Sequence, residues 1–182
     1  MAASGGTGLR VDPVLSFNFV VTLLDSSSSL AVGSVASGIE SAAAGGFSEC
    51  SGLEMSLDVE EYREGGRNSE VLQFPTRIKW SKITLKRGIA ISTALWDWHY
   101  SFVEGNGKRR DGLVVLMNNL HVPNNIWYFR RGLPVRYTGP SMNASQNSVA
   151  VESLEIAHEG IFQLPGVGVG GAAISGAAAV AV

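Results

Sequence analysis

The sequence has one cysteine, few charged residues and no secretory signal. A single cysteine, Cys50, cannot form an internal disulfide, which excludes a disulfide-stabilised scaffold. Charged residues make up 16% of the 182 positions, below the roughly 25% usual for soluble domains. The 14 basic and 16 acidic residues leave a net charge of −2, which argues against a generally basic nucleic-acid-binding surface or an acidic tail. No apolar segment follows a basic start, so we expect synthesis in the bacterial cytoplasm.

Two stretches consist almost entirely of small residues. Residues 26–46 are almost wholly Ser, Ala and Gly with Glu40 as the only charge, and residues 160–182 carry no charge. Small side chains bury little apolar area against a backbone ordering cost of roughly 1–2 kcal/mol per residue. Both stretches are therefore predicted to be mobile appendages, or to be ordered only by a neighbouring subunit. The second stretch contains Pro165 and lacks flanking basic residues, so we do not expect it to insert stably in a membrane.

The remaining sequence predicts one antiparallel β domain with a single helix. Strands are expected at 14–24, 53–62, 76–87, 112–118, 125–137 and 148–157, because apolar and β-branched residues alternate there between Gly, Pro and Asn turns. The change of parity between Trp80 and Ile83 predicts a bulge or bend near Ser81-Lys82. Leu95, Trp98, His99 and Phe102 lie on one face of a helix predicted over 92–103, with Ser92 as its N-cap and Gly105 as its end.

Charge is separated along the chain. Residues 49–70 hold seven acidic and two basic residues, a net charge of −5, whereas residues 77–87 hold five basic residues and no acidic one. Two interpretations remain open at this stage. Neighbouring strands can neutralise each other across one sheet, or complementary faces can meet between subunits.

No group of residues predicts catalysis, a cofactor or a metal site. The histidines His99, His121 and His158 have no metal-ligand spacing, and Cys50 is solitary. Glu60 and Glu61 point to opposite faces of a strand and cannot act as a catalytic pair. The glycine-rich run at 166–171 follows a proline and lacks the Lys-Ser/Thr of a phosphate-binding loop. We therefore expect a non-enzymatic protein with no cofactor.

A series of short motifs is ordered along the chain. It opens with residues 46–53 (GFSECSGL) and 60–66 (EEYREGG). The later motifs are 83–88 (ITLKRG), 95–98 (LWDW), 110–112 (RDG), 127–129 (WYF), 139–140 (GP), 143–144 (NA) and 149–160 (VAVESLEIAHEG), with 17–19 (FNF) before them. Together they extend over most of the chain, and in this order they resemble the tail tube proteins of contractile phages and of phage-tail-like extracellular contractile injection systems.

The resemblance implies packed antiparallel sheets with a flanking helix, in a subunit that forms a hexameric ring. The inner strands of the ring would join into one continuous β-barrel, and rings would stack into a hollow tube inside a contractile sheath. The implied partners are further copies of this chain, the sheath, baseplate or spike proteins, and cargo or DNA passing through the lumen without specific binding. The haemolysin-coregulated protein of type VI secretion is a more distant relative in this picture.

The resemblance also implies a domain organisation. The tail-tube-like β domain would occupy residues 14–160, after an N-terminal arm at 1–13 and before a Gly/Ala-rich C-terminal extension at 161–182. The family joins its first strand to the Gly-Phe motif by a short connection, whereas this chain has a Ser/Ala/Gly insertion at 26–45. The insertion and the extension leave open whether the chain is the main tube subunit, a baseplate-proximal initiator or a terminal ring.

The segregated charges supply the candidate subunit-interface or lumen residues. If the apolar side of strand 53–62 packs inside the subunit, its acidic side faces the lumen or an outer surface. A negative lumen would repel a polyanionic cargo and let it slide. The candidates are Glu54, Asp58, Glu60, Arg77, Lys79, Lys82, Lys86 and Arg87. The alternative function is a stand-alone ligand- or nucleic-acid-binding β-barrel module, which would be a monomer.

Overall fold

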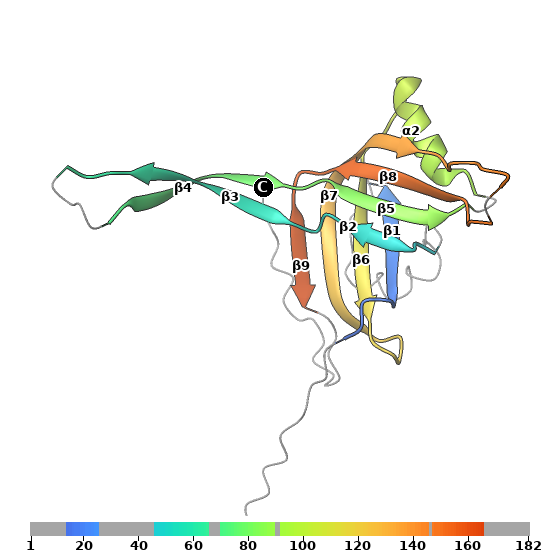
Figure 1. Cartoon of the computed structure of the whole chain (residues 1–182), viewed down its shortest axis with the longest axis horizontal. Coiled ribbons are helices and arrows are strands. Elements are labelled where there is room, and N and C mark those ends of the chain that lie inside the picture. Colours follow the sequence, from blue (N-terminus) through green and yellow to red (C-terminus); the bar gives the residue numbers. More distant parts are fainter. Residues whose placement is uncertain (1–13, 26–45, 66–69, 90–91, 146, 166–182) are drawn as a thin grey trace, which may run out of the picture.

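The computed structural model describes residues 14–25, 46–65, 70–89, 92–145 and 147–165. This part of the chain is mainly β, with one α-helix and two antiparallel sheets (Figure 1). The elements are β1 (Phe19–Asp25), β2 (Glu49–Ser51), β3 (Met55–Tyr62), β4 (Leu72–Trp80), β5 (Ile83–Gly88), α2 (Ala94–Val103), β6 (Arg110–Met117), β7 (Pro123–Thr138), β8 (Val151–Ala157) and β9 (Ile161–Pro165).

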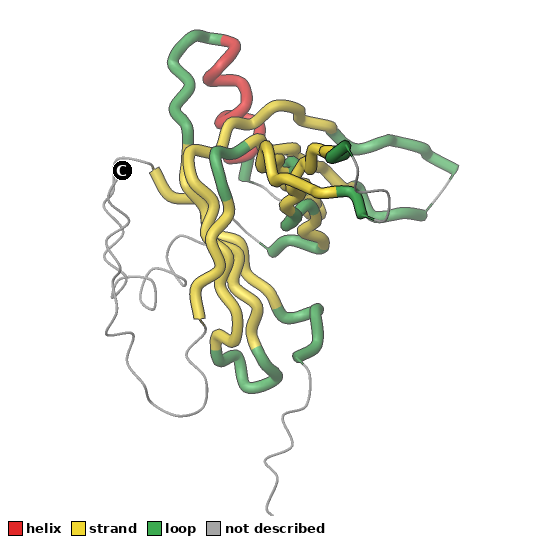
Figure 2. The backbone as a smooth tube through the Cα atoms, turned by 90° about the vertical axis from the view of Figure 1, so that its left-hand side faces the viewer, coloured by secondary structure: helices red, strands yellow, loops and turns green. Residues whose placement is uncertain are grey.

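The long strand β7 organises the larger, seven-stranded sheet. Its first half pairs with β6 and β9, its second half pairs with β8, and the strand order is β1-β6-β7-β8-β5-β2. Between the halves, Arg131 has a φ of +50°. At Gly132 a β-carbon would lie 2.8 Å from the carbonyl oxygen of Arg110. This bend turns one continuous sheet into two layers whose strands run in different directions (Figure 2).

The hydrophobic core fills the space between these two layers. Val21, Val114 and Phe129 come from the β1-β6-β7 layer, and Leu85, Leu154 and Ile156 come from the β5-β8 layer. Helix α2 closes one side with Leu95 and Trp98, both almost fully buried. Complete burial of each such side chain is worth about 1.5–3 kcal/mol. In β5 and β8 buried and partly buried residues alternate, as expected for strands with one face on a core.

The structure confirms most of the expected elements and corrects their limits. The helix begins at Ala94 with Thr93 as its N-cap rather than Ser92, and Gly105 follows its end with a φ of +80°. The expected strand 76–87 is two strands, because the chain breaks at Ser81-Lys82 and β4 and β5 then pair with different partners.

The expected C-terminal extension begins later than predicted. Residues Ile161–Pro165 form β9, which pairs with the first half of β7. The composition of residues 160–182 concealed this strand because the few larger side chains of the segment are concentrated at its start. The predictions for residues 1–13, for the insertion 26–45 and for residues 166–182 lie outside the described residues.

Candidate functional site

Strands β3 and β4 form a hairpin that projects from the body of the molecule. In Figure 1 it extends well beyond the two-layer sheet. In the described part of the chain the two strands pair with each other and with no other strand. We call this unit, Met55–Tyr62 with Leu72–Trp80, the projecting hairpin.

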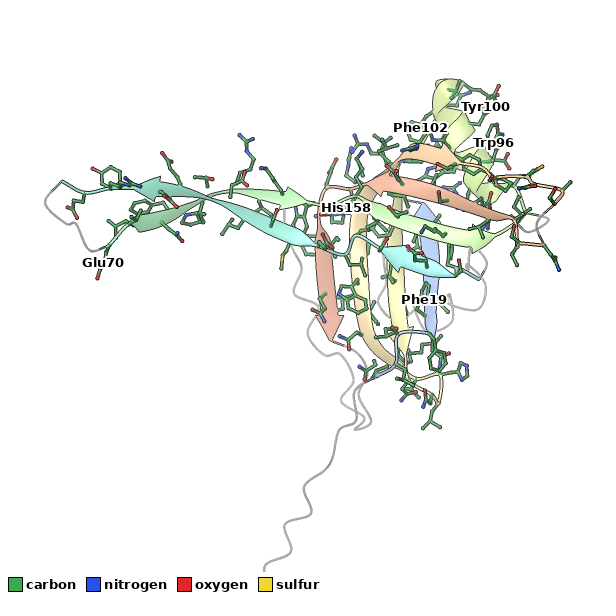
Figure 3. All side chains as sticks on the ribbon, in the orientation of Figure 1. Phe19, Glu70, Trp96, Tyr100, Phe102 and His158 are labelled. Carbon is green, nitrogen blue, oxygen red and sulfur yellow. The ribbon has the colours of Figure 1, made fainter. Side chains whose placement is uncertain are left out.

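The projecting hairpin exposes large apolar side chains that no described part of the chain covers. Met55, Leu57 and Ile78 share one face near the base, and they are 74%, 52% and 58% exposed. Beyond the register shift between Leu57 and Val59, Tyr62 and Phe74 pack edge to face at 6.3 Å, and both remain exposed. Figure 3 shows side chains standing out on both sides of the hairpin with no other element against them. Exposed large apolar side chains of this kind are typical of an interaction site.

This arrangement corrects the prediction for strand 53–62. The position of its acidic side depends on the condition that its apolar side packs inside the subunit, whereas β3 is exposed on both faces over nearly its whole length. Alternation follows from the pleat of a strand, but burial also needs a second layer. No described element forms such a layer over the hairpin. The condition under which the acidic side would face the lumen or an outer surface is therefore not met within the described part of the chain.

Several candidate charged residues pair within the chain. Lys79 contacts Asp58 at 2.7 Å, Lys86 contacts Glu49 at 2.9 Å, and Lys82 lies 3.8 Å from Glu155. These exposed pairs follow the first interpretation of the charge pattern, neutralisation across neighbouring strands, and each is worth about 0–1 kcal/mol. Glu60 and Arg77 have no ion pair among the described residues, and Glu54 accepts a hydrogen bond from Ser81 Oγ at 3.3 Å.

Arg87 is a core residue and not a surface candidate. Its side chain is 1% exposed and forms an ion pair with Glu152, which is also buried. Arg87 Nη2 donates to the carbonyl of Ser92 at 2.9 Å, and the Tyr137 hydroxyl donates to Glu152 Oε2 at 2.6 Å. Burial, helped by the Glu152 hydrogen bond, raises the pKa of Tyr137 to about 12. The cluster joins β5, β7, β8 and the segment before α2.

The base of the projecting hairpin is a tight junction. Gly52 has a φ of +87°, and a β-carbon on it would lie 2.0 Å from the carbonyl oxygen of Lys82. Next to it, the Ser81 N–H donates to the carbonyl of Glu54 at 3.3 Å. The chain therefore enters and leaves the hairpin through two segments that touch backbone to backbone.

Replacement of Gly52 by alanine tests this junction. We expect a loss of at least about 1–2 kcal/mol in the free energy of unfolding, because a side chain with positive φ is strained and the Lys82 carbonyl must also move. Urea denaturation followed by circular dichroism measures the change. Gly65→Ala, where a β-carbon meets nothing within 4 Å, is the control, and equal stabilities of the two variants would contradict the close approach.

The histidines and the cysteine lie apart. His99 Nδ1 is 3.2 Å from the Pro134 carbonyl on β7, His121 lies in the turn after β6, and His158 follows β8. No group of three or more His, Cys, Asp or Glu side chains in the described ranges could hold a metal ion. Burial, reinforced by Glu49, raises the pKa of Cys50 to about 11, so its thiol stays protonated at neutral pH. At ten residues, the helix of the described part is too short to span a bilayer.

A second exposed apolar surface lies on α2. Trp96 and Tyr100 stack at 5.8 Å, Trp96 meets Tyr137 edge to face at 5.1 Å, and Val103 continues the stripe one turn further. Figure 3 shows Trp96 and Tyr100 on the outer end of the molecule. The helix face predicted from the sequence, with Leu95 and Trp98, is the buried one. The spacing of residues 96, 100 and 103 was the available signal for the exposed stripe.

Comparison with known proteins places these features in a family. The model of the T4-like virus tail tube protein gp19 family matches residues 15–162. A chain in the baseplate of the anti-feeding prophage, solved with six-fold symmetry, is 23% identical with a TM-score of 0.71, covering 86% of this chain and 98% of that one.

Two further solved structures are similar. A chain of the sheath-tube complex of the extracellular contractile injection system PVC is 23% identical with a TM-score of 0.68, covering 84% of this chain and 92% of that one. A chain of the tube-terminating cap of the anti-feeding prophage is 22% identical with a TM-score of 0.71, covering 91% and 99%. No curated protein sequence matches. Because the family model covers most of the described sheet, the chain belongs to the T4-like tail tube protein family.

Proposed function

We propose that the chain is a non-catalytic structural subunit of the inner tube of a phage-tail-like contractile injection particle. The observation that carries this proposal is the projecting hairpin, whose large apolar side chains are exposed in the single chain. Burying each of them would contribute about 1.5–3 kcal/mol. Because the chain belongs to a family of tube proteins, we propose that a second copy of the chain covers these side chains.

Six copies in a ring would complete the sheet. Within the described residues the larger sheet is open, with β1 and β2 at the two ends of its strand order. Unpaired edges favour association with further strands, and closure into a barrel removes them. In a cyclic hexamer each contact is head to tail, so the hairpin of one subunit meets a different surface of the next.

The similar structures support a place in a larger particle. Their descriptions include a baseplate, a sheath-tube complex and a tube-terminating cap. We propose that stacked rings of this chain bind a contractile sheath outside and a baseplate or spike at one end, and that cargo or DNA passes through the lumen without specific binding. Synthesis in the cytoplasm would precede assembly into a particle that can be released.

The exposed charges would then orient the contacts. We propose that Glu60 and Arg77, which have no ion pair in the described part of the chain, make contacts between copies or line the lumen. The residues with partners within the chain, Glu54, Asp58, Lys79, Lys82 and Lys86, would flank those contacts.

The state of the purified chain tests the proposal. We expect the full-length protein to form hexameric rings, or tubes of stacked rings, in sedimentation velocity and in negative-stain electron micrographs. The physical reason is that repeated head-to-tail contacts close only when every hairpin is covered. A monodisperse monomer over the whole accessible concentration range would contradict the proposal and favour a stand-alone binding module.

A further inference from the structure

The first half of β7 forms a four-stranded layer with β9 on one side and β6 and β1 on the other (Figure 1). One face of this layer belongs to the hydrophobic core, to which it contributes Val21, Val114 and Phe129. Successive residues of a strand point to opposite faces, so the residues that alternate with these form a second face. We call it the far face, because it is directed away from the core.

Apolar side chains occupy the far face in two rows that cross all four strands. The pairing of the strands places Leu164, Ile126, Val115 and Val20 in one row and Phe162, Tyr128, Leu113 and Thr22 in the other. No residue of either row is charged. Tyr128 and Phe162 also contact each other, with ring centroids 6.4 Å apart. The far face therefore has the composition of a core rather than that of a sheet face in contact with water.

The central side chains of the far face are as inaccessible as those of the core. Val115 is 0%, Leu113 4% and Ile126 6% exposed. The partly buried side chains that pack against them all belong to the same four strands, and they are those of Leu24, Met117, Tyr128 and Leu164. A sheet face that is buried to this extent requires a second layer. Among the described elements, none outside these four strands contributes to this cluster.

Thr22 is a second sign of that layer. Its side chain is 2% exposed, and its Oγ1 has no hydrogen-bond partner among the described residues. A hydroxyl group removed from water is costly unless it forms a hydrogen bond. The main-chain N–H and C=O groups of a covering segment would supply the partner.

The C-terminal tail, residues 166–182, begins where it can form this layer. It follows Pro165, the last residue of β9, and Phe162 and Leu164 of the same strand are themselves part of the far face. Its 17 residues can extend over about 55 Å, whereas four strands are about 15 Å across. The tail is therefore long enough to cross the far face more than once.

The composition of the tail matches that of the far face. Apart from Ser175, the tail consists of Gly, Ala, Val and Ile and carries no charge. The insertion at 26–45, which follows β1 of the same layer, is rich in serine and contains Glu40. Small residues let a backbone lie close to large side chains. The apolar area removed from water would come mainly from the sheet, which offsets the small area that the tail itself can bury.

We propose that residues 166–182 form the second layer on the far face of the same chain. Apolar contacts with the two rows hold the tail, and its main chain provides the hydrogen-bond partner of Thr22. The cover is complete in a single subunit and needs no neighbouring copy. Its consequence for the tube, that the tail lines the wall formed by these strands, rests on the proposed function.

The reactivity of a cysteine at position 22 tests the cover. Thr22→Cys is introduced into a Cys50→Ala background, in the full chain and in a chain that ends at Pro165. Alkylation by iodoacetamide without denaturant is followed by mass spectrometry, and circular dichroism monitors the fold. We expect the shortened chain to react at least ten times faster, because its cysteine has lost the cover. Met142→Cys, at a position that is 86% exposed, is the control and should react equally fast in both chains.

The rates are compared at concentrations where sedimentation velocity shows monomer. If rings persist at the lowest concentration, the comparison is made in the variant Leu57→Asp with Ile78→Lys on the projecting hairpin. Protection in the monomer supports the cover. Protection that appears only in rings would overturn it, because the covering segment would then belong to another copy.

Equal rates in the full and shortened monomers would also overturn the cover, because the tail would then not protect the far face. If the shortened chain does not fold, the full chain with Ile174→Asp and Val180→Asp decides. Charged residues cannot lie on an apolar face without a large desolvation cost, so we expect this variant to react at least ten times faster than the unchanged tail, and unchanged protection would contradict the proposal. Because every rate is measured on the single subunit, failure of the cover is distinguishable from failure of the proposed assembly.

Discussion

Replacing Arg87 by alanine is expected to lower the free energy of unfolding by about 3–5 kcal/mol. The substitution leaves the carboxylate of Glu152 buried with only the Tyr137 hydroxyl as a hydrogen-bond donor among its described contacts. It also removes the donor to the Ser92 carbonyl, which ties the segment before α2 to β5. Since a domain of this size is stable by about 5–15 kcal/mol, much of the protein is expected to unfold at moderate temperature. Urea denaturation followed by circular dichroism gives the value.

Lys86→Ala is the matched control for this loss. Lys86 precedes Arg87 on β5 and pairs with Glu49, but both partners are about half exposed, so the expected loss is about 0–1 kcal/mol. Replacing both buried partners, Arg87→Met with Glu152→Leu, should recover part of the stability lost by Arg87→Ala, because no charge is then left unpaired. Equal effects of Arg87→Ala and Lys86→Ala would show that the buried pair is not important for folding.

The burial of Arg87 could be predicted from its position in the alternating pattern of its strand. Ile83, Leu85 and Arg87 occupy alternate positions of one strand, and the first two are core residues. Glu152 has the same relation to Leu154 and Ile156 on β8. Alternation therefore identified the inward face correctly, but a charged residue on that face was interpreted as a surface residue because its partner is 65 positions away.

The exposure of the projecting hairpin could not be predicted from the alternation of its residues. The alternation of apolar and polar residues is as regular in β3 as in β5. The two strands differ in what covers them. Inward side chains of β5 and its neighbour β8 pack in the hydrophobic core, whereas β3 pairs only with β4 in the described part of the chain. Local periodicity states which side is apolar and does not state what covers it. In a subunit of an assembly the covering layer can belong to another chain.

Packing explains why some of the short motifs occur together. Gly112 and Phe129 are opposite each other on β6 and β7, and a β-carbon on Gly112 would lie 2.2 Å from Phe129 Cζ. Beside them the Tyr128 hydroxyl donates to Asp111 Oδ2 at 2.6 Å, and burial raises the pKa of Tyr128 well above its usual value. The motifs at 110–112 and 127–129 are thus two sides of one contact, which single-chain periodicity cannot reveal.

Charging the apolar face of the projecting hairpin is expected to abolish rings and tubes while leaving a folded subunit. In the double variant Leu57→Asp with Ile78→Lys, both positions are more than half exposed in the single chain and are directly paired on β3 and β4. Exposed substitutions of this kind usually alter stability by about 0.5 kcal/mol or less. In a covered interface the same side chains would have to be desolvated, at a cost of several kcal/mol for each contact.

Every subunit of a ring repeats the contact, so the desolvation cost arises at each contact between neighbouring subunits. We expect sedimentation velocity to show only monomer at concentrations where the unchanged chain forms rings, with a circular dichroism spectrum and a urea midpoint close to those of the unchanged chain. The conservative pair Leu57→Met with Ile78→Leu keeps the surface apolar and should assemble. If the charged variant were folded and still formed rings at the same concentrations, the apolar face of the hairpin would not be a contact between copies, and the open edges at β1 and β2 would have to carry the assembly alone.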